Sequence, residues 1–149
     1  MCSCAIDAIN NRKVITCDIP AAFLQTLWPK EKYPTYIRFD GEMVDMICEI
    51  DKKYEQYKCP TKSGRGLMYG EMNRAVYRHM LSGILWYQKL KYHLEEWGFE
   101  MNPYDECVFN KMVDGAQCTI LYHVDDLKVS HRDQSCLLYT SDAADEVVS

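Results

Sequence analysis

Apolar residues in this chain follow two different spacings, and the longer segment follows the helical one. Between Glu71 and Trp97 they recur at the spacing of a single helix face, at Leu85, Trp86, Leu90, Leu94 and Trp97. Ser82 suits the N-cap of such a helix, and Gly98 suits its C-terminal stop. The pattern therefore predicts a helix in this region, with both tryptophans in the core.

Shorter apolar runs bounded by turn residues predict strands. Residues 14–19 form one run, which should end before Pro20 because proline cannot donate to a strand ladder. Residues 106–112 and 117–122 flank Asp114-Gly115, a strong hairpin signal. A further strand should follow the Asp125-Asp126 turn. Together with the helix, these runs predict an α+β fold with a mostly antiparallel sheet.

The remaining segments carry weaker signals. Residues 36–39 and 43–48 predict a strand, a turn and a second strand, and residues 60–70, with three glycines, predict a flexible connector. Ala5 to Asn10 is compatible with the end of a helix. The acidic stretch from Cys136 to Ser149 has no strand period, so we expect a separate, disordered tail after a domain spanning 1–135.

Composition narrows the classes of protein. A chain of 149 residues with 48% hydrophobic content can build one domain with a real core. No apolar run approaches the ~20 residues of a spanning helix, so we expect no membrane association. The eight cysteines form no C-x-x-C pair, which favours small core residues in a reducing, intracellular compartment over a zinc site.

The net charge of −5 has the wrong sign for a simple nucleic-acid binder, so any basic footprint must be local. The best local patch interleaves Tyr54 and Tyr57 with basic residues at Lys52, Lys53, Lys58, Lys62 and Arg65. Bases could stack on these tyrosines while the cations contact phosphates. The alternative is a solvated loop with structural tyrosines.

Three carboxylates are the candidate ligands of a divalent cation. Asp125 and Asp126 lie in a turn between two apolar, β-branched runs, and Asp18 lies at the end of a strand far upstream. Adjacent carboxylates repel, and a hard divalent cation would relieve this repulsion. An Asp-Asp turn alone is commonly just a solvated turn, but a third carboxylate at a strand end matches the arrangement used in two-metal phosphoryl transfer.

Five motifs in order resemble the reverse transcriptases of copia-type retrotransposons. They are Asp18-Ile19-x-x-Ala22-Phe23-Leu24, Trp86 to Leu90, Trp97-Gly98-Phe99, Asp105 to Phe109, and Val124-Asp125-Asp126. The likeness runs from about Ala5 to about His131. It implies the palm of an RNA-directed DNA polymerase, a ferredoxin-like sheet backed by helices. The stretch between Phe23 and Gly70 would then hold insertions or part of the fingers.

The resemblance also implies roles for individual residues. Asp18 and Asp125 would hold two Mg²⁺ ions, or Mn²⁺, with the Ile19 carbonyl as an extra ligand and Asp126 as an alternate ligand. The implied partners are an RNA or DNA template-primer, deoxynucleoside triphosphates and the rest of a retrotransposon polyprotein, in a cytoplasmic particle or the nucleus. The thumb, connection, ribonuclease H and integrase regions of the family are not expected in this chain.

Further roles concern the nucleotide and the primer end. Phe23 would exclude a 2′-hydroxyl, and ordinary core packing is the alternative role for this residue. His123 and Val124 would lie at the primer end, where the family commonly has tyrosine in place of His123. The family's Tyr-Gly-Leu-Lys-Gln-Ala stretch is altered here, with Arg78 at the glycine position, and Arg78 would have to supply a phosphate contact.

Two other readings stay open. The chain is also compatible with a non-catalytic retrotransposon remnant that folds and at most binds nucleic acid weakly. Another palm-containing nucleotidyl transferase or cyclase would share the carboxylates but lack the two tryptophan motifs.

Overall fold

The computed structural model describes residues 2–61, 66–135 and 137. It divides the chain into two compact units, one formed by residues 1–26 and 75–149 and the other by residues 27–74. No helix in the described part is long and apolar enough to cross a membrane. The chain is a mixed α and β protein with antiparallel sheets, as the apolar spacing predicts.

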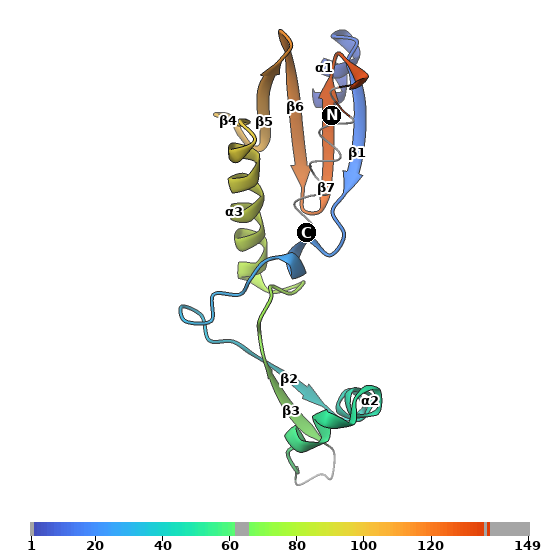
Figure 1. Cartoon of the computed structure of the whole chain (residues 1–149), viewed down its shortest axis with the longest axis vertical. Coiled ribbons are helices and arrows are strands. Elements are labelled where there is room, and N and C mark those ends of the chain that lie inside the picture. Colours follow the sequence, from blue (N-terminus) through green and yellow to red (C-terminus); the bar gives the residue numbers. More distant parts are fainter. Residues whose placement is uncertain (1, 62–65, 136, 138–149) are drawn as a thin grey trace. The chain divides into compact units, whose positions relative to one another are not determined.

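The first unit is built on one antiparallel sheet with the strand order β1-β7-β6-β5-β4 (Figure 1). Its elements are α1 (Cys2–Ile9), β1 (Lys13–Asp18), the short 3₁₀ helix η1 (Ala22–Gln25), α3 (Met80–Glu96), β4 (Glu100–Asn102), β5 (Asp105–Val113), β6 (Ala116–His123) and β7 (Asp126–His131). Both β1 and β6 pair antiparallel with β7, so these two strands run in the same direction. The chain between them contains the second unit, α3, β4 and β5, and residues of α3 share the core of the sheet.

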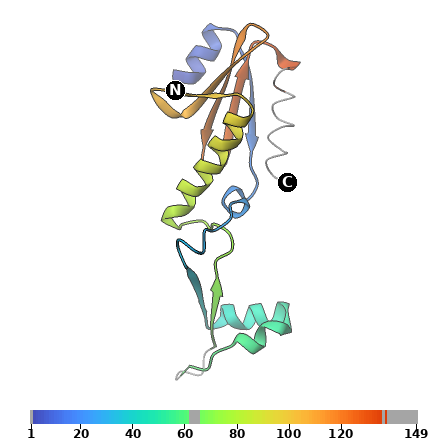
Figure 2. The same ribbon diagram turned by 60° about the vertical axis from the view of Figure 1, so that its left-hand side comes forward.

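Helix α3 covers one face of this sheet, as Figure 2 shows from a second angle. Trp86, Leu90 and Leu94 are buried on it. They share a core with Ile19, Ala22, Phe99, Phe109, Cys118, Ile120, Leu127, Val129 and Leu137. Leu137 is the one described residue of the expected tail; the rest of that tail, Cys136 and residues 138–149, lies outside the described residues.

The helix prediction is right in its centre and wrong at its start. Glu71 belongs to a strand, and α3 begins at Met80 with His79 as its N-cap, whose Nδ1 accepts the Leu81 N–H at 3.3 Å. Ser82 is instead fully buried in the first turn, and its hydroxyl accepts the Val76 N–H at 3.1 Å. Gly98 ends the helix with φ 79°, a conformation that glycine adopts without strain.

The second unit pairs β2 (Tyr36–Asp40) with β3 (Leu67–Glu71), and α2 (Glu42–Ile50) and the 3₁₀ helix η2 (Lys52–Tyr57) lie between them in sequence. The strand predicted at residues 43–48 is wrong because Val44 and Cys48, four positions apart, are buried on one helix face. The predicted connector at residues 60–70 contains the start of β3, and its residues 62–65 lie outside the described part.

Candidate functional site

The end of β1 and the β6–β7 hairpin meet at one end of the large sheet. In the register of β1 with β7, Asp18 lies opposite Asp126. The ladder extends one residue further, because the Ile19 N–H donates to the Asp125 carbonyl at 2.8 Å. Two motifs that are more than a hundred residues apart in the sequence are therefore neighbours across two hydrogen-bonded strands.

Asp18 and Asp126 form a pair in which side chains approach closely. Hydrogen-bonded and non-hydrogen-bonded pairs alternate along an antiparallel ladder, and Ile19 with Asp125 takes the hydrogen-bonded position. Asp18 and Asp126 therefore form a non-hydrogen-bonded pair, whose Cα atoms lie about 4.5 Å apart. Like charges placed directly opposite destabilise a sheet, so this pair is an electrostatic cost that a bound cation would remove.

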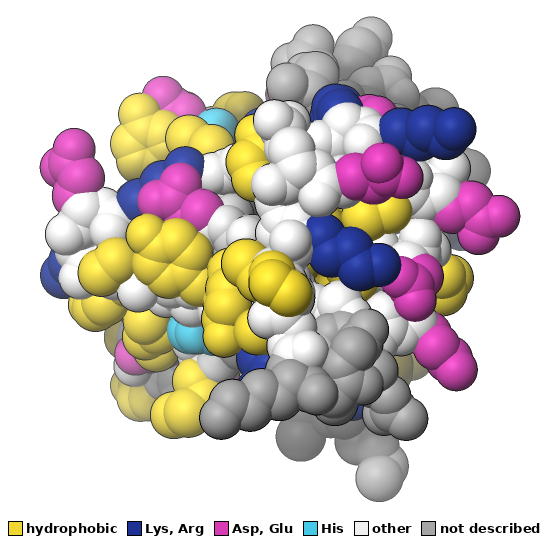
Figure 3. Space-filling model, turned by 90° about the horizontal axis from the view of Figure 1, so that it is seen from below, with side chains coloured by type: hydrophobic (Ala, Val, Ile, Leu, Met, Phe, Trp, Pro, Cys, Tyr) yellow, Lys and Arg dark blue, Asp and Glu magenta, His cyan; other side chains and the backbone are white. Residues whose placement is uncertain are grey.

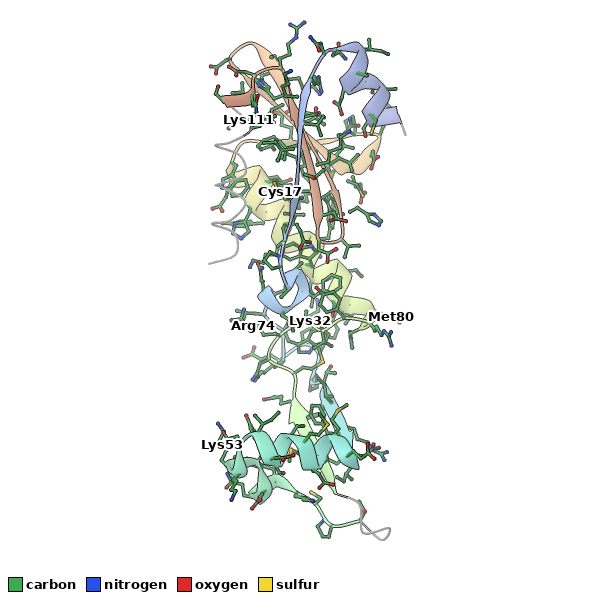
Figure 4. The ribbon with its side chains drawn as sticks, turned by 90° about the vertical axis from the view of Figure 1, so that its right-hand side faces the viewer. Cys17, Lys32, Lys53, Arg74, Met80 and Lys111 are labelled. Carbon is green, nitrogen blue, oxygen red and sulfur yellow. The ribbon has the colours of Figure 1, made fainter. Side chains whose placement is uncertain are left out.

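His123 extends this pair into a row across three strands. It lies opposite Asp126 in the β6–β7 register, so His123, Asp126 and Asp18 share one face of the sheet. All three are exposed. The neighbouring residues Cys17 and Leu127 point to the opposite face, into the core under α3. Figure 4 marks Cys17 on β1, one residue before Asp18. The row thus lies on the face away from α3, which we call the open face.

The turn that carries Asp125 is strained at its first residue. Val124 has φ 60°, a conformation that a β-branched residue rarely adopts. Of the two turn residues only Val124 has positive φ, which matches a type II′ hairpin turn. The Val124 carbonyl accepts the indole N–H of buried Trp86 at 2.6 Å. A core tryptophan on α3 therefore holds this turn in place.

Asp125 is set apart from the other two carboxylates. It lies opposite Ile19, which is buried in the core, and it is itself half-buried. Among residues 2–61, 66–135 and 137, no group of three or more His, Cys, Asp or Glu side chains is placed to hold a metal ion. The carboxylate donors suit Mg²⁺ chemically.

Phe23, His123 and Val124 line a common cavity of about 250 Å³, with Gly83, Trp86, Cys107 and Tyr122. Phe23 is half-buried, and its ring packs against that of Tyr77 with centroids 4.7 Å apart. It is supported by η1, which follows a left-handed residue, Ala21, with φ 54°. The structure therefore brings the expected sugar-contacting and primer-end residues together.

Arg78 does not line this cavity. It is exposed and follows Tyr77, the ring partner of Phe23. Its φ of 68° lies in the left-handed region that favours glycine. The backbone at this position thus has a conformation that favours glycine, although the residue here is arginine.

Two supporting contacts were not predictable from the residue pattern. The helical spacing marks Trp86 as a core residue but carries no signal for the hydrogen bond to Val124. The Lys89 ammonium donates to the Gln25 carbonyl at 3.2 Å and ties α3 to the end of η1. Both contacts join α3 to the loops around the carboxylates.

The lysine-tyrosine patch of the second unit carries less unpaired positive charge than its sequence suggests, because two of its lysines form ion pairs. Lys53 pairs with Asp51 and Lys58 with Asp45, both at 2.6 Å. Tyr54 and Tyr57 line an apolar groove of about 620 Å³ with Phe39, Ile47, Ile50, Met68, Tyr69 and Gly70. Figure 3 shows exposed hydrophobic side chains next to both basic and acidic ones, and Figure 4 marks Lys53. Lys62 and Arg65 lie outside the described residues.

Comparison with known proteins identifies no relative. No protein-family model matches the chain. No curated protein matches it. No solved structure matches it.

Proposed function

We propose that this chain is the palm of an RNA-directed DNA polymerase, of the kind found in copia-type retrotransposons. The observation that carries the proposal is the register of β1 with β7. It brings Asp18 opposite Asp126 and binds Ile19 to Asp125, at the end of the sheet and on a strained turn. Strained turns held by surrounding structure concentrate at functional sites.

Four further features support the same proposal. The antiparallel sheet with α3 packed on one face agrees with a ferredoxin-like palm. Phe23, His123 and Val124 line one cavity, and Val124 directly precedes Asp125 in the chain. Arg78 has the backbone conformation of the glycine that the family carries. The second unit, residues 27–74, overlaps most of the stretch between Phe23 and Gly70 that is assigned to family insertions or partial fingers.

In nucleotidyl transfer, the residues of the site would have different roles. Asp18 and Asp126 would hold a divalent cation, Mg²⁺ or Mn²⁺, with Asp125 and the Ile19 carbonyl as further oxygen donors. Such a cation supplies charge neutralisation for a triphosphate and acidifies a primer hydroxyl. Phe23 would limit the space at the sugar, and His123 and Val124 would support the primer end. Template-primer and deoxynucleoside triphosphates are the substrates, inside the cell, with the rest of a retrotransposon polyprotein as partner.

A second candidate is a non-catalytic remnant of the same ancestry. The finding that favours it is that the described side chains do not gather three metal ligands. The altered stretch from Tyr77 to Ser82 points the same way, because Arg78 is a strained replacement for glycine and does not line the cavity that contains Phe23.

Single-nucleotide addition separates the two candidates. The chain is mixed with an RNA template and a labelled DNA primer, with Mg²⁺ and then Mn²⁺, beside an Asp18→Asn variant. We expect addition of one or a few nucleotides that depends on the metal and is lost in the variant, but little processive synthesis at a net charge of −5. No addition by a folded chain, or equal addition by Asp18→Asn, would assign it to the remnant.

A further inference from the structure

Helix α1 lies over the open face of the large sheet and is attached to it by polar contacts. Asp7 is the one buried residue among the helix side chains that the structure describes, while Ile6 and Ile9 are exposed. A cavity of about 670 Å³ is lined by residues of the helix and of strands β5, β6 and β7. Burial of apolar surface therefore contributes little to holding α1 in place.

The attachment depends on one carboxylate between two cations. The Lys128 ammonium lies 2.5 Å from Asp7 Oδ2 and also donates to the Ser3 hydroxyl at 3.0 Å. The Arg12 guanidinium lies 4.0 Å from Asp7 Oδ1 and donates to the Thr119 hydroxyl at 3.0 Å. Asp7, Arg12 and Lys128 have side chains only 8%, 12% and 17% exposed, so water screens these charges weakly.

The cations under α1 are neighbours of the candidate site. Lys128 lies two residues after Asp126 on β7, on the same face, and Thr16 lies opposite it, two residues before Asp18. Ser130 and Thr119 form the next row across the sheet. A strand of nucleic acid that reaches the carboxylates over the open face would meet Lys128 and Arg12 next.

We propose that Lys128 and Arg12 form a phosphate-binding surface on the open face, and that the Asp7 carboxylate of α1 occupies it in place of a phosphate. Carboxylate and phosphate oxygens are equivalent partners for these two cations. Nucleic acid then binds by displacing α1, and α1 lowers the affinity of the chain for nucleic acid until it is displaced. The choice of nucleic acid as the partner rests on the proposed function.

The first test measures binding of a short fluorescent RNA–DNA duplex by anisotropy. Asp7→Asn should bind roughly tenfold more tightly than the unmodified chain at low salt, because two cations become free. Its affinity should also fall more steeply with salt, by a log–log slope greater by about 2, close to 0.9 per phosphate contact. Adding Lys128→Gln to Asp7→Asn should remove most of the gain.

Asp114→Asn is the matched control. It removes the same charge from an exposed turn at the end of the same sheet, and asparagine tolerates the left-handed φ of 50° at this position. It should change affinity less than twofold. Equal gains in Asp7→Asn and Asp114→Asn would reduce the effect to net charge and overturn the proposal.

A second test uses the unmodified chain, so that misfolding of a variant cannot obscure the result. Addition of the duplex should speed hydrogen exchange at the amides of α1 while leaving those of α3 unchanged. Greater protection of α1 in the complex would overturn the proposal. Neither readout requires catalysis, so failure of nucleotide addition and failure of this inference are distinguishable.

Discussion

Two hairpin turns connect neighbouring strands of the same sheet, and they are built in opposite ways. Asp114-Gly115 joins β5 to β6 with φ 50° and 75°, and both residue types accept such values at little cost. Val124-Asp125 joins β6 to β7 with φ 60° on a β-branched valine. The residues of the first turn adopt positive φ at little cost. In the second turn, positive φ falls on a β-branched residue for which this conformation is unfavourable.

The difference shows which of the two turns depends on contacts with the rest of the protein for its conformation. The first turn needs no outside support, and a Cβ built on Gly115 meets nothing within 4 Å. The second turn is held by the Trp86 indole on one side and by Ile19 on the other, which bind its two carbonyls. Strain of about 1–3 kcal/mol persists only where such contacts outweigh it. The strained turn is the one that carries the carboxylates.

Trp86→Phe should give the largest effect. The substitution keeps an aromatic ring but removes the N–H that binds the Val124 carbonyl, and it leaves a small void in the core. We expect a loss of about 2–4 kcal/mol in the free energy of unfolding, measured with urea. Trp97→Phe, at the half-buried C-cap of the same helix, should cost less than half as much. Equal costs would show that Trp86 acts by size alone.

Gly115→Val tests the relaxed turn. Space is not limiting there, so the cost comes from the φ of 75° alone. Thermal unfolding should show a loss of about 1–3 kcal/mol. An unchanged free energy of unfolding in Gly115→Val would contradict the contrast drawn between the two turns.

Val124→Gly is the reciprocal change and should stabilise the fold by about 1 kcal/mol. The valine is 41% exposed, so little buried surface is lost. Denaturant unfolding beside Val129→Gly, a buried strand position that should be strongly destabilised, provides the check. A loss of stability in Val124→Gly would mean that the side chain, and not the backbone conformation, sets the energy of this turn.

Asp126→Asn should give the smallest effect. It removes one of two like charges placed opposite each other and should raise stability by about 0.2–1 kcal/mol at low salt without divalent cations. The gain should shrink as salt screens the pair. Asp114→Asn, in the relaxed turn, has no opposing carboxylate in the register and should show no such gain.

Much of the large sheet follows from local pattern. The Asp114-Gly115 signal and the apolar runs around it specify β5 and β6, and Pro20 marks the end of β1. The helix at residues 43–48 was missed because Met43, Met46 and Ile50 are exposed apolar residues, which obscure the four-residue spacing of the buried face. The start of α3 was missed because Ser82 is buried and a histidine caps the helix.

For the candidate site, the sequence pattern predicted the meeting of Asp18 with the Asp125-Asp126 turn, and the register agrees. It placed Asp18 and Asp125 as the primary pair, whereas the ladder puts Asp126 opposite Asp18. Which of two adjacent carboxylates faces a given strand depends on where the turn begins, and a shift of one residue reverses it. The positive φ of Val124 and of Arg78 depends on tertiary contacts that no local pattern encodes.

Divalent-cation binding tests the central claim most directly, because the claim is that the strained turn and β1 present carboxylates for a metal. Thermal unfolding is followed with and without Mg²⁺, for the unmodified chain, Asp126→Asn and Asp114→Asn. At a concentration of about 100 times Kd, Mg²⁺ should stabilise the unmodified chain and Asp114→Asn by about 2.7 kcal/mol, and Asp126→Asn far less. No stabilisation of the unmodified chain at any Mg²⁺ concentration, or equal stabilisation of Asp126→Asn, would contradict the account.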